Sequence, residues 1–205
     1  MQMTIAVRAN GEQKKEFLSK KIPGAVELVW LQKSDTLQSV NADIYFDLLF
    51  GDVLHQASEN KPVVVNAVVV TAKELPKNYI RINAWPGFLE REITEFAVGA
   101  EGEKQAKQVF QELGWKYKQT ADVPGMITAR IICKIINEAY FALGEGISTK
   151  EEIDIAMKLG TNYPYGPFEW GEKIELKNVY RLLKKLSKED ESYAIAPKLE
   201  EEAGR

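Results

Sequence analysis

Short apolar segments alternate with polar, helix-forming segments through the first part of the chain. The apolar segments are nearly continuous in Val, Ile, Leu, Tyr and Phe, which is typical of strands buried on both faces of a sheet. We expect strands over residues 3–7, 25–31, 42–50, 61–70, 78–85, 92–98 and 117–122. Helix-forming residues predict helices over 12–22, 51–60 and 101–115. Because strands and helices alternate, the pattern predicts a mostly parallel α/β sheet.

Helical periodicity replaces this alternation near residue 122. Residues 126–143 are apolar on more than one helical face, which is typical of a helix buried in a core or at a subunit interface. A turn over 162–171 precedes an amphipathic helix over 176–186 and a charged tail over 187–205. The chain therefore divides into an α/β part, residues 1–121, and a helical part, residues 122–205.

One further helix is expected over residues 151–160. Ser148 and Glu151 fit a capping box, in which the hydroxyl and the carboxylate each satisfy a free backbone N–H group. Gly160 is a suitable C-terminal stop.

Composition and charge exclude several classes of protein. The 205 residues are 45% hydrophobic, which is enough for a substantial core. A net charge of −3 gives no general attraction to nucleic acid, although a local basic patch stays open, and no apolar run is long enough to cross a membrane. The first residues lack the basic-then-apolar order of a signal peptide, so we expect a cytoplasmic protein.

Single copies of cysteine and histidine restrict the possible chemistry. Cys133 has no partner for an intrachain disulfide, and it lies among isoleucines, where a thiol serves as a small packing group rather than a nucleophile. His55 is interpreted as a surface or packing residue, with a relocated base as the alternative. No cysteine or histidine cluster exists to bind a metal.

Residues 123–170 carry a set of motifs in a fixed order. The set comprises Pro124-Gly125, Asn137-Glu138-Ala139, Glu145-Gly146, Ile153-Asp154, Ala156-Met157 and Gly166-Pro167-Phe168-Glu169. In this set the chain resembles the C-terminal domain of the 3-hydroxyacyl-CoA dehydrogenases, and residues 196–205 resemble the last helix of that family.

The resemblance implies an α/β fold in which a reduced, Rossmann-like, mostly parallel sheet is followed by an all-helical C-terminal domain. It further implies a homodimer formed through the C-terminal helices and a cleft for an acyl-CoA ligand. In the family, the reaction is oxidation of an L-3-hydroxyacyl-CoA with NAD.

The expected cofactor loop departs from the family pattern. Glycines after the first strand let the backbone approach the diphosphate, whose charge faces a helix N-terminus. Here Arg8, Asn10 and Gln13 occupy the three glycine places, Gly11 is out of register, and Glu12 adds a negative charge. After the second strand, where the family places a ribose-binding acid, an acid appears only at Asp35. We therefore predict no cofactor, and NAD only if the enzyme is active.

The catalytic positions also differ. Alignment on Trp85-Pro86 places Ile82 where the family has its catalytic histidine, or Arg81 or Asn83 if the register moves by one. None of these side chains is a general base at neutral pH. Glu95 corresponds to the glutamate that orients the histidine and is the one retained catalytic candidate.

Asn66, Trp85 and Arg130 are the candidates for lining a substrate crevice. Asn66 begins the segment that matches the family's serine-containing motif, whose hydroxyl is lost, and the family's asparagine before Arg130 is replaced by Ala129.

Aromatic and charged side chains around this stretch have simpler interpretations. Trp85 and Phe88 could stack on a ligand, but core packing is the favoured interpretation. The charged run Glu90, Arg91, Glu92 and Glu95 is interpreted as a solvated face.

Three functional hypotheses follow. The first is a non-catalytic relative with a binding or assembly role linked to acyl-CoA metabolism. The second is an active NAD-dependent L-3-hydroxyacyl-CoA dehydrogenase with an unusual cofactor site or residues supplied by a partner. The third is an acyl-CoA or nucleotide sensor.

Overall fold

A computed structural model describes residues 2–51 and 60–204 of the chain. It divides into two compact units, residues 1–126 and 127–205. The boundary between Met126 and Ile127 lies a few residues beyond the predicted change near residue 122. Each unit is described separately below.

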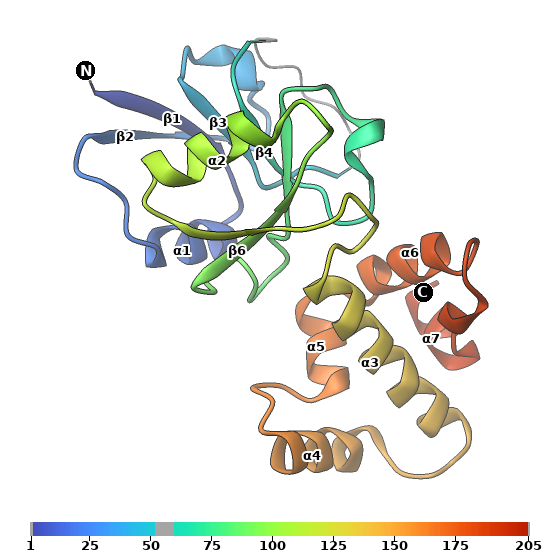
Figure 1. Cartoon of the computed structure of the whole chain (residues 1–205). Helices are drawn as coiled ribbons and strands as arrows, with labels where there is room; N and C mark the ends of the chain where they lie inside the picture. Colours follow the sequence, from blue (N-terminus) through green and yellow to red (C-terminus); the bar gives the residue numbers. More distant parts are fainter. Residues whose placement is uncertain (1, 52–59, 205) are drawn as a thin grey trace. The chain divides into compact units, whose positions relative to one another are not determined.

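The first unit contains a seven-stranded sheet in the order β2-β1-β3-β4-β5-β6-β7 (Figure 1). All neighbouring strands are parallel except β5 and β6, which run antiparallel. The predicted mostly parallel α/β fold is therefore confirmed. The elements are β1 (Met3–Arg8), α1 (Gly11–Ser19), β2 (Val26–Leu31), β3 (Ile44–Asp47), β4 (Val63–Asn66), β5 (Tyr79–Ile82), β6 (Ile93–Ala97), α2 (Glu103–Glu112) and β7 (Lys116–Gln119).

Alternate side chains of the strands supply two apolar layers. Ile5 and Val7 of β1 join Phe17 of α1 and Phe110 of α2 in one buried cluster, so both helices cover the same face of the sheet. Ala6 faces the opposite side, in a second cluster that includes Leu37 and Ala42 from the segment between β2 and β3. The buried strands thus have apolar neighbours on both faces, as their composition predicts.

Some predicted boundaries in this unit are wrong. The strand predicted over 61–70 covers only Val63–Asn66, because the Ala67 N–H donates to the Val65 carbonyl at 2.9 Å and turns the chain. The helix predicted over 12–22 ends at Ser19, after which Lys20 is extended. Most of the helix predicted over 51–60, and His55 with it, lies outside the described residues.

The second unit is helical. Its elements are α3 (Thr128–Gly144), α4 (Lys150–Thr161), α5 (Pro167–Lys173), α6 (Leu176–Leu186) and α7 (Pro197–Ala203). Helix α3 packs against α5, α6 and α7, and α4 contacts α5 (Figure 1). The α3 side chain of Asn137 connects the unit's last segment to its centre, since its amide donates to the Ala194 carbonyl at 2.8 Å and accepts from the Ala196 N–H at 2.9 Å.

The predicted caps of α4 are each displaced by a residue or two. Thr149 and Glu152 form the capping box in place of Ser148 and Glu151, because Thr149 is the residue with extended backbone before the first helical turn. The helix continues through Gly160 to Thr161 and ends at Asn162, which adopts a left-handed conformation.

The turn predicted over 162–171 is also shorter than expected. Pro167 takes the first position of α5, where its fixed φ and missing N–H suit a helix start.

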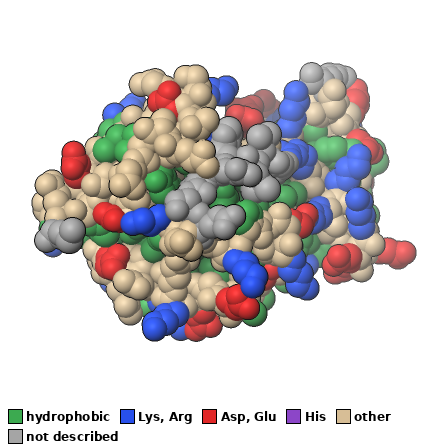
Figure 2. All heavy atoms as spheres, turned by 90° about the horizontal axis from the view of Figure 1, so that it is seen from above, with side chains coloured by type: hydrophobic (Ala, Val, Ile, Leu, Met, Phe, Trp, Pro, Cys, Tyr) green, Lys and Arg blue, Asp and Glu red, His purple; other side chains and the backbone are tan. Residues whose placement is uncertain are grey.

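Charged side chains of both signs are interspersed on the face of the molecule shown in Figure 2. Within the described part of the chain, no helix has the length and apolar character needed to cross a bilayer.

Candidate functional site

The carboxyl ends of β1 and β3 meet where the strand order reverses, which is the usual ligand position in open α/β sheets. Here two charged side chains fill that position. Arg8 ends β1 and Asp47 ends β3, and they are direct neighbours in the ladder. The Arg8 Nε and Nη2 donate to the two carboxylate oxygens at 3.0 and 2.8 Å. Their side chains are only 4% and 1% exposed, so this is a buried, bidentate ion pair.

The N-terminus of α1 is occupied by the chain's own side chains. The Gln13 N–H donates to Asn10 Oδ1 at 2.8 Å, and the Asn10 N–H donates to Gln13 Oε1 at 3.1 Å, which completes a capping box. The Gln13 Nε2 also donates to the Leu48 carbonyl at 2.6 Å. The Gln13 N–H, one of the groups that a Rossmann helix offers to a diphosphate, is therefore already bonded inside the protein.

These residues do not fit a dinucleotide diphosphate. Gly11 is no substitute for the missing glycines, because a Cβ at this position would meet no atom within 4 Å and no close backbone approach depends on it. Asp35, the nearest acid after β2, accepts from the Gln32 N–H at 2.7 Å and so stabilises its own turn.

Asn66 extends the same network to the next strands. Its Nδ2 lies 3.4 Å from the Leu48 carbonyl, and its Oδ1 accepts from the Ala84 N–H at 3.0 Å. This crevice candidate therefore connects the ends of β3, β4 and β5. The side chain of Trp85, the second crevice candidate, is buried.

The strand pair β5 and β6 holds the residues that the resemblance aligns with the family's catalytic positions. Ile82 pairs with Phe96, and one step further along the antiparallel register Asn83 comes opposite Glu95. Of the three residues considered at the histidine position, Asn83 is therefore the one opposite Glu95, and its carboxamide does not titrate. Both side chains are buried, so the interpretation of Glu95 as part of a solvated face is wrong: β6 carries it into the sheet.

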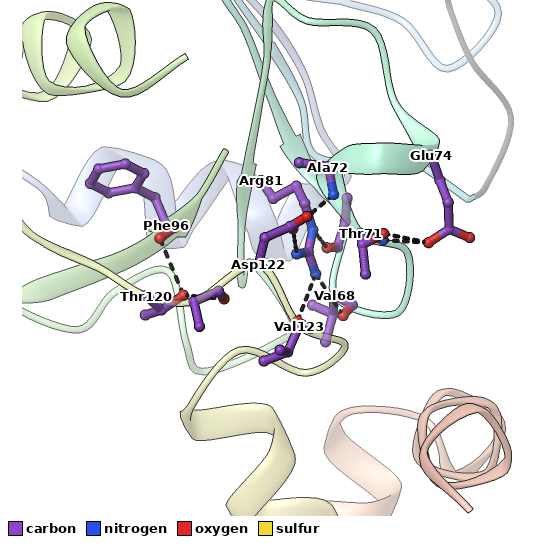
Figure 3. A network of polar contacts seen from close by, with 11 residues as sticks. Val68, Thr71, Ala72, Glu74, Arg81, Phe96, Thr120, Asp122 and Val123 are labelled. Carbon is purple, nitrogen blue, oxygen red and sulfur yellow. Dashed lines mark hydrogen bonds and ion pairs between the residues drawn. The ribbon is translucent and has the colours of Figure 1, made fainter. Parts of the chain in front are cut away.

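Arg81, the third residue considered at the histidine position, has a structural role (Figure 3). Its guanidinium is fully buried and donates to Asp122 Oδ1 at 2.5 Å. Further donors reach the Ala67, Val68 and Val123 carbonyls at 3.0, 3.3 and 3.3 Å. The side chain thereby fastens the segment after β4 to the segment after β7.

The turn after β5 is held by a buried carboxylate. Glu16 of α1 accepts from the Gly87 N–H at 2.6 Å and the Leu89 N–H at 3.2 Å. Burial raises the pKa of Glu16 above its ordinary value, although the two N–H donors act in the opposite direction. Trp85 and Phe88 in this turn are buried, which confirms their interpretation as core residues.

Arg130, the remaining crevice candidate, belongs to the second unit. Its Nε donates to the Tyr193 hydroxyl at 2.8 Å, and its guanidinium lies over the Tyr193 ring. Cys133, on the same helix, is fully buried, and burial raises the pKa of its thiol. The packing interpretation of Cys133 is confirmed.

Sequence reasoning identified Arg8 only as a lost glycine and did not consider Asp47. The sequence does contain a signal for the ion pair, because two buried strands end in side chains of opposite charge. Their separation of 39 residues concealed the pair, whereas the parallel register brings them together.

Among the described residues, no group of three or more histidine, cysteine, aspartate or glutamate side chains could hold a metal. A cavity of about 460 Å³ lies at the amino ends of β1 and β3, at the opposite edge from Arg8 and Asp47, with Asp43, Gln105 and Gln108 in its lining.

Comparison with known proteins agrees with the two-part architecture. The family model for the C-terminal domain of 3-hydroxyacyl-CoA dehydrogenase matches residues 125–203. The 3-hydroxyadipyl-CoA dehydrogenase of Escherichia coli is 43% identical over 83 residues, which are 40% of this chain and 18% of that protein. The 3-hydroxybutyryl-CoA dehydrogenase of Bradyrhizobium diazoefficiens is 30% identical over 149 residues, 70% of this chain and 50% of that protein. The matched regions thus span half or less of these relatives.

A solved structure extends the likeness across the chain. The (S)-3-hydroxybutyryl-CoA dehydrogenase of Ralstonia eutropha aligns with a TM-score of 0.71 over 98% of this chain and 93% of its own, at 19% identity. That identity supports the fold alone. The fold is Rossmann-like with a helical C-terminal domain. The sequence matches place residues 125–203 in the 3-hydroxyacyl-CoA dehydrogenase family, as its C-terminal domain.

Proposed function

We propose that this chain is a non-catalytic member of the family with a binding or assembly role linked to acyl-CoA metabolism. The observation that carries the proposal is the buried Arg8–Asp47 ion pair at the strand-order reversal. Releasing the pair to admit a dinucleotide would break two hydrogen bonds between buried, desolvated charges. The capped start of α1 adds a second obstacle, because the side chains of Asn10 and Gln13 occupy it and already bond the Gln13 and Asn10 N–H groups.

The catalytic positions support the same proposal. Proton abstraction from a 3-hydroxyl group needs a base that titrates near neutral pH. Asn83 and Ile82 lack such a group, and Arg81 is committed to Asp122. Among the described residues, Glu95 faces no histidine that it could orient, so we assign it a structural role and no catalytic one.

Calorimetric titration with NADH, with and without acetoacetyl-CoA, tests the proposal. The 3-hydroxybutyryl-CoA dehydrogenase of Bradyrhizobium diazoefficiens is a suitable positive control. We expect no heat with NADH. Heat with the thioester alone would favour a ligand-binding role, and no heat with either would favour assembly. Saturable NADH binding at micromolar concentration, followed by turnover, would overturn the proposal and restore the dehydrogenase hypothesis.

We also propose a homodimer through the C-terminal helices. The support is a group of large apolar side chains on α3 and α4 that are exposed in the described part of the chain. Leu159 is 83% exposed, and Ile131 and Ile155 are each more than half exposed. Such a surface favours a protein partner, and the family resemblance favours a second copy.

A further inference from the structure

Strand β2 forms one edge of the sheet (Figure 1). In the usual dinucleotide-binding order, a further strand lies outside the second one. Here residues 32–43 lead from β2 directly to β3, on the other side of β1. Among the described residues, no strand lies beyond β2.

The composition of β2 is that of an interior strand. Its sequence, Val-Glu-Leu-Val-Trp-Leu, has one charged residue, and four of its side chains are only half-buried. The opposite edge is protected in the common way, because Lys116 and Lys118 of β7 place charges in solvent. An apolar edge without lysine or proline is a template for pairing with another strand.

The backbone groups that β2 offers can be deduced from its ladder with β1. The Met3 N–H donates to the Ala25 carbonyl at 3.0 Å, and residues bonded to one neighbour alternate along a parallel strand. Odd-numbered residues of β2 therefore face β1. Leu28 and Trp30 direct their N–H and C=O groups to the open edge, whereas the Val26 N–H already bonds the Pro23 carbonyl at 3.0 Å.

We propose that this edge binds β2 of a second copy of the chain in antiparallel orientation, about a two-fold axis at Val29. In that register, Leu28 of each copy stands opposite Trp30 of the other. Opposed residues of a hydrogen-bonded pair exchange both bonds, so every outward group of Leu28 and Trp30 is satisfied.

The side chains of β2 also favour a second copy of β2 at this edge. Leu28 and Trp30 pack on the α1 side of the sheet, so the register places an aliphatic and an aromatic side chain together twice across the axis. Val29 meets its own copy on the other face. Glu27 comes opposite Leu31, which keeps the two carboxylates apart. Self-complementarity of this kind is what a two-fold interface requires.

Charge substitutions at Val29 test the axis directly. Val29→Lys and Val29→Glu each place like charges opposite one another, which destabilises a cross-strand pair. Light scattering over a concentration series should give each variant about half the mass of the wild-type assembly. A mixture of the two variants should recover the wild-type mass, because opposite charges then meet at the axis. Thermal melting of each variant verifies that it is folded.

Lys118→Glu on β7 is the matched control, since it changes charge at the other edge and should leave the mass unchanged. Equal masses for wild type and both Val29 variants at every concentration would overturn the proposal. So would a loss of mass that mixing does not restore, because it would mean that residue 29 does not meet its own copy and that any strand at this edge belongs to another protein.

Discussion

Arg8 and Asp47 have both been removed from water, and the Arg8 guanidinium donates two hydrogen bonds to the Asp47 carboxylate. Replacing one member takes the opposite charge away from a buried charge, for which we expect a loss of about 3–5 kcal/mol in the free energy of unfolding for Arg8→Met or Asp47→Leu. The double variant should recover most of this loss, since two apolar groups need no partner. Urea denaturation measures the free energy of unfolding of the two single variants and of the double variant.

The exposed pair Lys77–Glu101 provides the control for this prediction. Its side chains are 84% and 74% exposed, so Lys77→Met should cost at most about 1 kcal/mol. An equally small effect of Arg8→Met would contradict the view that the buried pair closes the crevice.

Glu16 makes the stability of the first unit depend on pH. Its pKa in the folded protein is raised above the ordinary value of a glutamate, chiefly by burial. Between the unfolded and folded pKa the unfolded chain binds fewer protons, so stability falls as pH rises through this window. Glu16→Gln should flatten that decline when unfolding is measured at intervals from pH 4 to pH 7. A wild-type curve that rises where the variant's curve is flat would show that the shift has the opposite sign.

At the scale of elements, the start of α5 depends on the close packing of Gly166 against the Asp154 side chain. The Asp154 carboxylate accepts from the Phe168 and Glu169 N–H groups at 2.8 and 3.1 Å. A Cβ on residue 166 would lie 2.3 Å from the Asp154 Cγ. Gly166→Ala should therefore destabilise the second unit by about 1–3 kcal/mol in thermal or urea unfolding.

Gly160 is the corresponding control within α4, because a Cβ there meets nothing within 4 Å. Gly160→Ala should stabilise the protein by up to about 1 kcal/mol through its helix propensity. If both alanine variants shift stability in the same direction, steric contact with Asp154 is not the cause.

Elements were predictable where a local pattern determines them. The helix over 176–186 coincides with α6, because the apolar positions of α6 repeat at helical spacing and its core-facing leucines are buried. The α4 cap was displaced because Ser148 and Thr149 are both chemically suited, and only the backbone conformation selects Thr149. The links Arg8–Asp47 and Arg81–Asp122 could not be derived from local pattern, since each joins segments that only the sheet brings together.

At the scale of the whole molecule, we propose two contacts with a second copy of the chain. One uses the exposed apolar side chains of α3 and α4, of which Leu159 is the most exposed, and the other uses the open edge of β2. Leu159→Lys should weaken the first contact, because it places charge at the most exposed apolar position in the second unit, while the helix itself tolerates lysine. Light scattering should report a decrease in mass of about twofold, with the helical content by circular dichroism unchanged.

Two separate two-fold contacts on one chain have a consequence that neither has alone. If both form, they link copies into a closed tetramer or, where the axes do not meet, into a growing chain. Leu159→Lys and Val29→Lys should each leave a dimer, held by the contact that remains, and the double variant should be a monomer. A double variant that is still dimeric would point to a third contact. A single variant that is already monomeric would mean that only the contact it alters forms in solution, and the identity of that variant would show which of the two it is.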